Sequence, residues 1–485
     1  MSKQKSQGLA SYENVNDSYL KRRRLSGSAG WPLLWSLGVG AVISGNFFGW
    51  NFGLAAGGFW GLTIATFLMA TMYVCIAYSI AELSAALPHA GGFYSFTRNA
   101  FGPFLGFICG VTIIIEYVLT PAVIVVGITG YLQPLMPAVP VYLLWLFAYA
   151  IFVAINIRSV ELTLNVGLIL TLVALMVLVI FYLSMVVAGV FSSELLFTIP
   201  PEPGQLATWL PKGWQGVFAA IPYAIWFYLA IEQLPLAAEE TGDVASNMPK
   251  ALTLGIFTLI ALSLFTLVLN SGVGGGAAAI SQSNVPLGAG LESYFGKGST
   301  SNFVTAIALT CGLIASFHTV IYAYGRVLFS LSRAGYLPRW ISVTSKNHTP
   351  YRALILGAVI GFICALIINI SGSGAVGAVL LNMSVFGAVL SYALVMFSYI
   401  KLKISRPDLP RPYKSPLGIW GAAIGAFLAI LSLFACFSVP TYRPGVWGVS
   451  IFLLVAILYF LLYGKNRLVA QAPEEKAALM LKRQA

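Results

Sequence analysis

Long apolar segments separated by short polar ones constrain the fold of this chain more than any other feature of its sequence. About twelve of them are long enough to cross a bilayer as helices, which takes about 20 residues each. Of the 485 residues, 59% are hydrophobic and 9% are charged, and the mean hydropathy is +0.87. Water-soluble domains carry about 25% charged residues. We therefore predict an all-α integral membrane protein with about 12 transmembrane helices.

The basic residues are distributed unevenly between the two sides of these predicted spans. Of the 27 Lys and Arg residues, only Lys212, Lys297 and Arg443 fall on one side, and the run KRRR at 21–24 lies with the others. The positive-inside rule then places both termini in the cytoplasm. The net charge of +12 thus reflects membrane orientation and not a nucleic-acid partner. We expect a multi-pass protein of the plasma membrane, or of the inner membrane in a bacterium, whose partner is the lipid bilayer and whose oligomeric state is left open.

Motifs for metal binding or catalysis do not occur in the sequence. The five cysteines lie inside apolar spans without metal-ligand spacing, and no nucleophile or nucleotide-binding pattern accompanies the three histidines. We therefore expect no metal, no enzymatic activity, and no cofactor apart from a coupling ion, H⁺ or Na⁺. Residues 1–30 are polar, lack a signal-peptide pattern and are predicted to form a disordered tail.

Two of the predicted spans, the first at about 31–57 and the sixth at about 213–239, are interrupted by polar residues and helix breakers. Each opens a block of five spans, so the second block starts on the opposite side of the membrane, as in an inverted repeat. The predicted segments are a cytoplasmic N-terminal tail (1–30), the first repeat (31–190), an external loop (191–212), the second repeat (213–402), two further spans (403–464) and a cytoplasmic C-terminal tail (465–485).

The interruption of the first span contains four glycines, Gly40, Gly45, Gly49 and Gly53. Glycine destabilises a helix interior by roughly 1 kcal/mol relative to alanine. A broken helix in hydrocarbon is tolerated only where its backbone lines a cavity or is buried in protein, and secondary transporters bind substrate at such breaks. The alternative interpretation is close helix packing through small residues.

Two carboxyl groups lie deep inside predicted spans. Glu116 is in the third span and Glu232 is at the interruption of the sixth. A charge at the bilayer centre costs at least about 2.5 kcal/mol, so such residues usually face a cavity or a partner. They are candidates for ammonium binding or proton handling, and the alternative is a protonated structural carboxyl. The preceding WFY at 226–228 would suit an ammonium through cation–π attraction, or would simply pack.

Three passages resemble the amino acid–polyamine–organocation superfamily of permeases. They are IAELSAALPHAGGFY at 80–94 with AFGP at 100–103, AEETGD at 238–243 with NMPKA at 247–251, and YGRVLFSLSRAGYLP at 324–338 with TP at 349–350. They occur in the order of that family. The resemblance covers about residues 30–460 and implies a five-plus-five inverted repeat, the LeuT-like fold, with discontinuous helices 1 and 6 and two extra C-terminal helices.

Within the superfamily, SGNFFGWN at 44–51 resembles the ethanolamine permease subgroup. Amino-acid members keep small residues at the positions of Asn46 and Phe47, where free amides take the substrate carboxylate, and ethanolamine has no carboxylate. Trp226, six residues before Glu232, matches a substrate-contacting Trp and a proton-sensitive Glu of the arginine–agmatine exchangers. The resemblance and the deep polar residues together predict a substrate site formed by Ser44, Gly45, Asn46, Phe47, Glu116, Tyr117, Trp226, Phe227, Tyr228 and Glu232.

The coupling ion is left open by the sequence. Sodium-coupled relatives hold sodium between hydroxyls of the eighth span and carbonyls of the first, and the eighth span here offers Ser316, His318 and Thr319. Proton-coupled relatives often use a lysine of the fifth span, which this chain lacks. Sodium, a proton on Glu232 or His318, and no coupling are the three alternatives.

Charged residues at the cytoplasmic span ends are candidates for an inner gate, or else they only cap helices and orient the protein. The candidate gate residues are Glu82, Arg98, Glu239, Glu240, Asp243 and Lys250. The predicted function is import of a small organic amine, with ethanolamine favoured, by alternating access. The rival predictions are an amino-acid permease or exchanger of the same fold, and a nutrient-sensing receptor, which would be expected to carry an added signalling domain.

Overall fold

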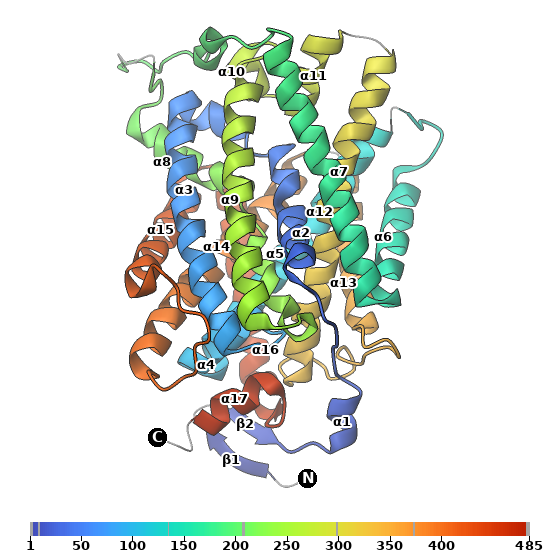
Figure 1. Cartoon of the computed structure of the whole chain (residues 1–485), viewed down its shortest axis with the longest axis vertical. Helices are drawn as coiled ribbons and strands as arrows, with labels where there is room; N and C mark the ends of the chain where they lie inside the picture. The colour runs from blue at the N-terminus through green and yellow to red at the C-terminus, as the bar shows by residue number, and fades with distance from the viewer. Residues whose placement is uncertain are drawn as a thin grey trace.

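The computed structural model describes residues 3–7, 10–133, 135–205, 209–296, 299–371 and 374–481, so the predicted external residue Lys297 lies outside the described residues. The chain forms a bundle of long helices that run roughly parallel to one axis (Figure 1). Eleven helical segments of the described chain are long and apolar enough to cross a membrane. This confirms the predicted all-α membrane protein.

The long helices follow the predicted spans closely. They are α3 (Phe52–Ala86), α5 (Pro103–Leu132), α6 (Val141–Arg158), α7 (Val160–Val187), α9 (Val244–Ser271), α12 (Ser299–Arg333), α13 (Tyr351–Ile370), α14 (Gly374–Ser405), α15 (Gly418–Ser438) and α16 (Arg443–Leu462). Shorter helical elements connect them at the ends of the bundle. These are α4 (Gly92–Phe101), η2 (Ser193–Phe197), α10 (Gly276–Ile280), α11 (Pro286–Phe295) and η5 (Gly464–Asn466).

The first predicted span is interrupted, as expected, and this is why it is absent from the eleven. Helix α2 (Trp31–Val42) has only 12 residues and ends in one 3₁₀ turn, η1 (Ile43–Asn46). The helix resumes at Phe52, and Gly58, with a φ of 71°, then turns the chain into the second crossing. An added Cβ at Gly58 would lie 2.5 Å from a carbon of Pro211. Glycine is therefore required at this turn for two reasons: it adopts the positive φ without strain, and it leaves room for the close contact with Pro211.

The sixth predicted span is interrupted too. Helix α8 (Gly213–Ala224) passes into the 3₁₀ turn η3 (Ile225–Phe227), and Ala230 then adopts a left-handed φ of 84°. The chain continues as η4 (Ile231–Glu240), whose Pro235 has no amide hydrogen to donate to a regular helix. The two interruptions meet, because an added Cβ at Gly45 would collide with the Trp226 carbonyl oxygen.

The interrupted elements lie inside a shell of long helices. Helix α12 is central, with 94% of its apolar window buried inside the protein, whereas α6 has 22%. Outward-facing side chains on the peripheral helices are large and apolar, such as Phe147 on α6 and Leu183 on α7, which are 67% and 59% exposed. Such surfaces suit contact with lipid, so polar chemistry is confined to the middle and the ends of the bundle.

The two chain termini fold together at one end of the bundle (Figure 1). Strands β1 (Lys3–Gln7) and β2 (Ala10–Glu13) pair antiparallel, and β2 pairs in parallel with β3 (Leu468–Val469). Helices α1 (Asp17–Lys21) and α17 (Pro473–Leu481) flank this sheet. We call these five elements the terminal cap. The prediction of a disordered N-terminal tail is therefore wrong, because a strand from the far end of the sequence supplies the backbone partner.

Buried ion pairs attach the terminal cap to the helical bundle. Glu475 of α17 accepts hydrogen bonds from Tyr12 and from Arg98 of α4, and the Arg98–Glu475 ion pair measures 2.7 Å. Arg333, at the end of α12, binds both Glu474 of α17, at 2.5 Å, and Glu239 of η4. Since removing one partner of a buried pair leaves an uncompensated charge, these contacts fasten the cap to α4, α12 and η4.

Candidate functional site

The two helix interruptions form the centre of the candidate site. Trp50 stacks on Phe227 with 5.5 Å between ring centroids, and Phe48 lies 6.5 Å from Trp226. Phe227 is fully buried and Trp226 is 6% exposed. Of the predicted site residues, Gly45 and Trp226 are thus in direct contact, since glycine alone lets the two backbones approach so closely.

The polar groups of the first interruption mostly bind neighbouring helices. The Ser44 amide donates to Ser316 Oγ (3.1 Å), and that hydroxyl donates to the Gly40 carbonyl (2.8 Å). Asn46 Oδ1 accepts a hydrogen bond from Thr266 of α9 (3.1 Å). Asn46 Nδ2, although fully buried, has no partner among the described residues. The Asn46 side-chain NH₂ group is therefore free to donate to another molecule. Phe47, the remaining predicted residue of this break, packs against Gly312 of α12.

Glu232 stands directly after the second interruption. Its Oε1 accepts hydrogen bonds from Tyr392 of α14 (2.6 Å) and from the Ala230 amide (3.2 Å). The left-handed conformation of Ala230 aims that amide at the carboxyl group of its near neighbour. The Glu232 side chain is buried, and apart from the neighbouring Glu116 carboxyl group its Oε2 has no partner among the described residues.

Glu116 of α5 faces Glu232 closely enough for the two carboxyl groups to interact electrostatically. Glu116 is 1% exposed, and apart from the hydrogen-bonding contact with the Glu232 carboxyl group its carboxyl oxygens have no partner among the described residues. We call Glu116 and Glu232 the acidic pair. Two carboxyl groups at close range repel each other when both are ionised. The pair therefore favours a shared proton or a bound cation between the two groups.

Tyrosine rings surround the acidic pair. Tyr73 of α3 lies 5.4 Å from the ring centroids of both Tyr228 and Tyr392, and its hydroxyl is 2.9 Å from that of Tyr392. The Tyr228 hydroxyl is 2.8 Å from Ser263 Oγ. The predicted site residue Tyr117 is buried beside Glu116. Sequence reasoning missed Tyr73 and Tyr392, whose only signal was a polar aromatic residue at middle depth in an apolar span.

The three polar residues of α12 do not gather around the acidic pair. Ser316 bonds to the interruption, and the Thr319 hydroxyl donates back to the Ala315 carbonyl (2.9 Å). His318 Nε2 donates to the Thr163 carbonyl of α7 (2.8 Å), and the His318 ring lies 5.4 Å from that of Phe152 on α6. His318 therefore lies against α6 and α7, away from the acidic pair.

The six predicted gate residues are not brought together in one cluster. Glu82 pairs with Lys403 (2.5 Å) and Arg411 (3.0 Å), and Arg98 pairs with Glu475. Asp243 and Lys250 take part in no ion pair between described residues. The remaining two candidates, Glu239 and Glu240, form buried ion-pair clusters with Arg333 and Arg326 of α12, which lie far from them in the sequence.

One of those clusters is formed by Glu240, Arg326 and Tyr322. The Arg326–Glu240 ion pair measures 2.9 Å and both side chains are fully buried. The Tyr322 hydroxyl donates to Glu240 as well, and the Arg326 guanidinium lies 3.6 Å over the Tyr322 ring centroid. This cluster ties η4 to α12 next to the pair formed by Glu239 and Arg333. The predicted motifs at 238–243 and 324–338 thus contact each other.

This chain is a multi-pass helical bundle, and its two interrupted helices meet beside buried charged and aromatic groups. That arrangement is typical of a class of membrane transporters. The chain belongs to the amino acid permease family, whose profile matches residues 30–462. This confirms membership of the superfamily that the sequence motifs indicated.

Several characterised and uncharacterised permeases are similar over most of their length. An uncharacterized transporter of Rhizobium meliloti is 28% identical over 90% of this chain and 92% of its own. The branched-chain amino acid permease BcaP of Bacillus subtilis is 27% identical over 89% and 91% of the two chains. L-asparagine permease 1 of Mycobacterium bovis is 24% identical over 86% of each. The chain is thus a transporter whose substrate these similarities leave undefined.

Proposed function

We propose that this permease imports a small organic amine, ethanolamine above others, by alternating access around the acidic pair. The observation that carries the proposal is the pairing of Glu116 with Glu232, whose carboxyl groups lie within hydrogen-bonding reach of each other. Apart from that contact, three of their buried oxygens have no partner among the described residues. Buried polar groups in proteins are otherwise almost always hydrogen-bonded. An ammonium group with three N–H donors supplies the missing partners.

The surroundings of the acidic pair favour a cation. The spans that carry the two interruptions and Glu116 contain no Lys, Arg or His residue, as the sequence of 31–57, 103–132 and 213–240 shows. Tyrosine faces add attraction for an ammonium of up to about 2 kcal/mol when it is desolvated. Asn46 Nδ2, the free donor of the first interruption, is our candidate partner for the ethanolamine hydroxyl.

An amino acid is the second candidate substrate, and the names of the relatives favour it. A branched-chain amino acid permease and an L-asparagine permease cover most of this chain. An amino acid requires a further partner for its carboxylate. A carboxylate left unpaired in a dry site costs more than the 1–3 kcal/mol typical of an unmet polar group, and no basic side chain belongs to the three spans named above.

Competition for uptake separates the two substrates. Purified protein in proteoliposomes would take up labelled ethanolamine in the presence of unlabelled serine, alanine, arginine or choline. We expect ethanolamine to compete at least about tenfold better than serine or alanine, a difference of about 1.4 kcal/mol. Equal competition by an amino acid would replace the ethanolamine proposal with an amino-acid permease. Binding without any accumulation would favour a nutrient-sensing receptor.

The same preparation addresses the coupling ion. Imposed proton and sodium gradients, tested in turn, would each drive accumulation only if that ion is coupled to the substrate. We infer proton coupling from the acidic pair, since a proton can occupy it when the ammonium has left. Ser316, the candidate sodium ligand, already donates to the Gly40 carbonyl. Accumulation driven by sodium alone would overturn this inference.

A further inference from the structure

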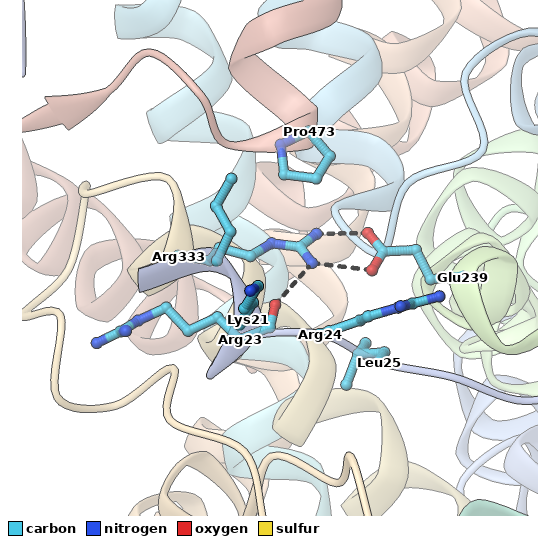
Figure 2. A pocket seen from close by; sticks show the side chains of 8 residues that line it. Lys21, Arg23, Arg24, Leu25, Glu239, Arg333 and Pro473 are labelled. Carbon is cyan, nitrogen blue, oxygen red and sulfur yellow. Dashed lines mark hydrogen bonds and ion pairs between the residues drawn. The ribbon is translucent and has the colours of Figure 1, made fainter. Parts of the chain in front are cut away.

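A cavity of about 470 Å³ lies where the terminal cap meets the helical bundle. The N-terminal segment, the end of η4, the end of α12 and the start of α17 all contribute to its wall (Figure 2). The lining residues are Leu20, Lys21, Arg23, Arg24, Leu25, Glu239, Arg333 and Pro473. Its volume lies within the range of about 300–1,000 Å³ that is usual for small-molecule sites.

The cavity wall carries more positive than negative charge. Four of its lining residues are basic and one, Glu239, is acidic. Lys21 and Arg24 are exposed, and their side chains have no hydrogen bond or ion pair with any described residue. In Figure 2 the Arg24 and Arg23 side chains extend in opposite directions from the N-terminal segment. The two free cations are therefore available to a bound anion.

Arg333 is paired with Glu239 and Glu474, whereas the charge of Arg23 is not compensated by a carboxylate of the described residues. The Arg23 guanidinium donates only to neutral acceptors, the Tyr19 and Arg339 carbonyls and Ser342 Oγ, at 2.8–3.1 Å. Burial lowers the pKa of Arg23, with a further lowering effect of the nearby Arg339, Arg22 and Arg352 cations and an opposing effect of Tyr19. A lowered arginine pKa means that the charged form lacks compensation at this place, and a bound anion would supply it.

Arg333 has one N–H group that lacks a hydrogen-bond acceptor among the described residues. Its two terminal nitrogens bind Glu239, Glu474 and the Arg23 carbonyl, yet its buried Nε has no partner among the described residues. The Arg333 side chain is 2% exposed. Buried polar groups without a partner are rare, so this N–H, on a residue that lines the cavity, is a candidate donor to a ligand oxygen.

We propose that this cavity is a binding site for a phosphate-bearing anion, which bridges the N-terminal segment and the end of α12. Phosphate oxygens fit the fork of arginine donors and the point charge of lysine. Two sources carry this chemistry: the headgroup of an anionic phospholipid at the membrane surface, and a soluble phosphate compound. By joining elements of the terminal cap to the bundle, the ligand stabilises the docked cap, because anything that binds only the docked state favours it.

Binding to the purified full-length protein in detergent tests this proposal without any transport measurement. Calorimetric titration would use pyrophosphate as the soluble probe and a short-chain phosphatidylinositol phosphate as the lipid probe. Short-chain phosphatidylcholine, which has no net charge, is the control ligand. Binding of either phosphate probe supports the site, and the probe that binds shows whether the ligand is a soluble phosphate compound or a lipid headgroup. Failure of both to bind would overturn the proposal.

Matched charge-removing variants distinguish the cavity from a diffuse basic surface. Lys21→Gln and Arg24→Gln each remove a free cation from the cavity wall, whereas Arg22→Gln removes an exposed cation of the same run that does not line it. Since charge-assisted hydrogen bonds are the strong ones, we expect the two cavity variants to raise the dissociation constant at least about fivefold. Arg22→Gln should raise it less than about twofold, because screening weakens an exposed charge that makes no direct contact. Equal effects of all three variants would show diffuse attraction and refute the cavity site.

Discussion

At the scale of single residues, the acidic pair is the feature on which transport depends. Glu232→Gln keeps the size of the side chain and an oxygen for the Tyr392 hydroxyl, but it removes a negative charge from the pair. Hydrogen bonds to charged groups contribute about 1.5–3 kcal/mol. We therefore expect the variant to fold and its uptake of labelled ethanolamine to fall at least about tenfold, with a flatter pH dependence. Glu116→Gln should weaken substrate binding, seen as a raised KM, more than it changes the pH dependence.

Glu161→Gln is the matched control for both variants. Glu161 lies in the first turn of α7 and is exposed, so its loss removes a carboxylate without touching the acidic pair. Size-exclusion chromatography would check that all three variants are folded. Uptake and pH profiles of Glu232→Gln and Glu116→Gln that match the unchanged protein would mean that both carboxyl groups are structural.

At the scale of elements, the docking of α17 is expected to depend on pH. Burial raises the pKa of Glu474 to about 7, against the opposing effect of Arg333 and with a further raising effect of Glu239. Tyr19 of α1 and Tyr94 of α4 also interact with Glu474. A carboxyl whose pKa is higher in the docked state stabilises docking fully below its undocked pKa of about 4.5, and this contribution is lost as the pH rises through about 7.

Tryptic cleavage at the exposed Lys476 of α17 measures this docking. Relative to a fully cleavable peptide under the same conditions, cleavage should be faster at about pH 8 than at about pH 6. Glu474→Gln should flatten the dependence, because its amide does not titrate. Glu13→Gln is the control: it removes a partly exposed carboxylate of the same cap, which pairs with Arg339 at 2.8 Å. This variant should retain the pH dependence of cleavage. A cleavage rate of the unchanged protein that is insensitive to pH would contradict the expectation.

At the scale of the whole molecule, the distribution of basic residues predicts the orientation in the membrane. Lys212, Lys297 and Arg443 are expected outside and both termini inside, following the positive-inside rule. Single cysteines introduced at these positions and near the termini, in a cysteine-free background, would be labelled with a reagent that does not cross membranes. Position 297 should react from outside intact cells. Labelling of position 297 only from the cytoplasmic side would reverse the proposed orientation.

The sequence alone determined the membrane crossings and the two interruptions, since both follow from local chemistry. A bilayer core requires long apolar helices, so the ends of α5 and α13 were readable from hydropathy. Glycine at position 45 and proline at position 235 act on the backbone where they stand, and the breaks lie around them. The family motifs were local as well. These features needed no knowledge of which helices are neighbours.

Tertiary structure decided which side chains complete the site and the cap. Tyr392 lies 160 positions from Glu232, and Glu475 lies 377 positions from Arg98, so no local pattern linked them. From the sequence alone, a tyrosine in an apolar span or a glutamate in a polar tail could pair with many different residues. Burying a polar or charged group is costly unless it is paired, and only the packed arrangement shows which partner meets that requirement. For this reason the acidic pair could be nominated as two separate residues, while its tyrosine surround and the folded terminal cap could not be predicted.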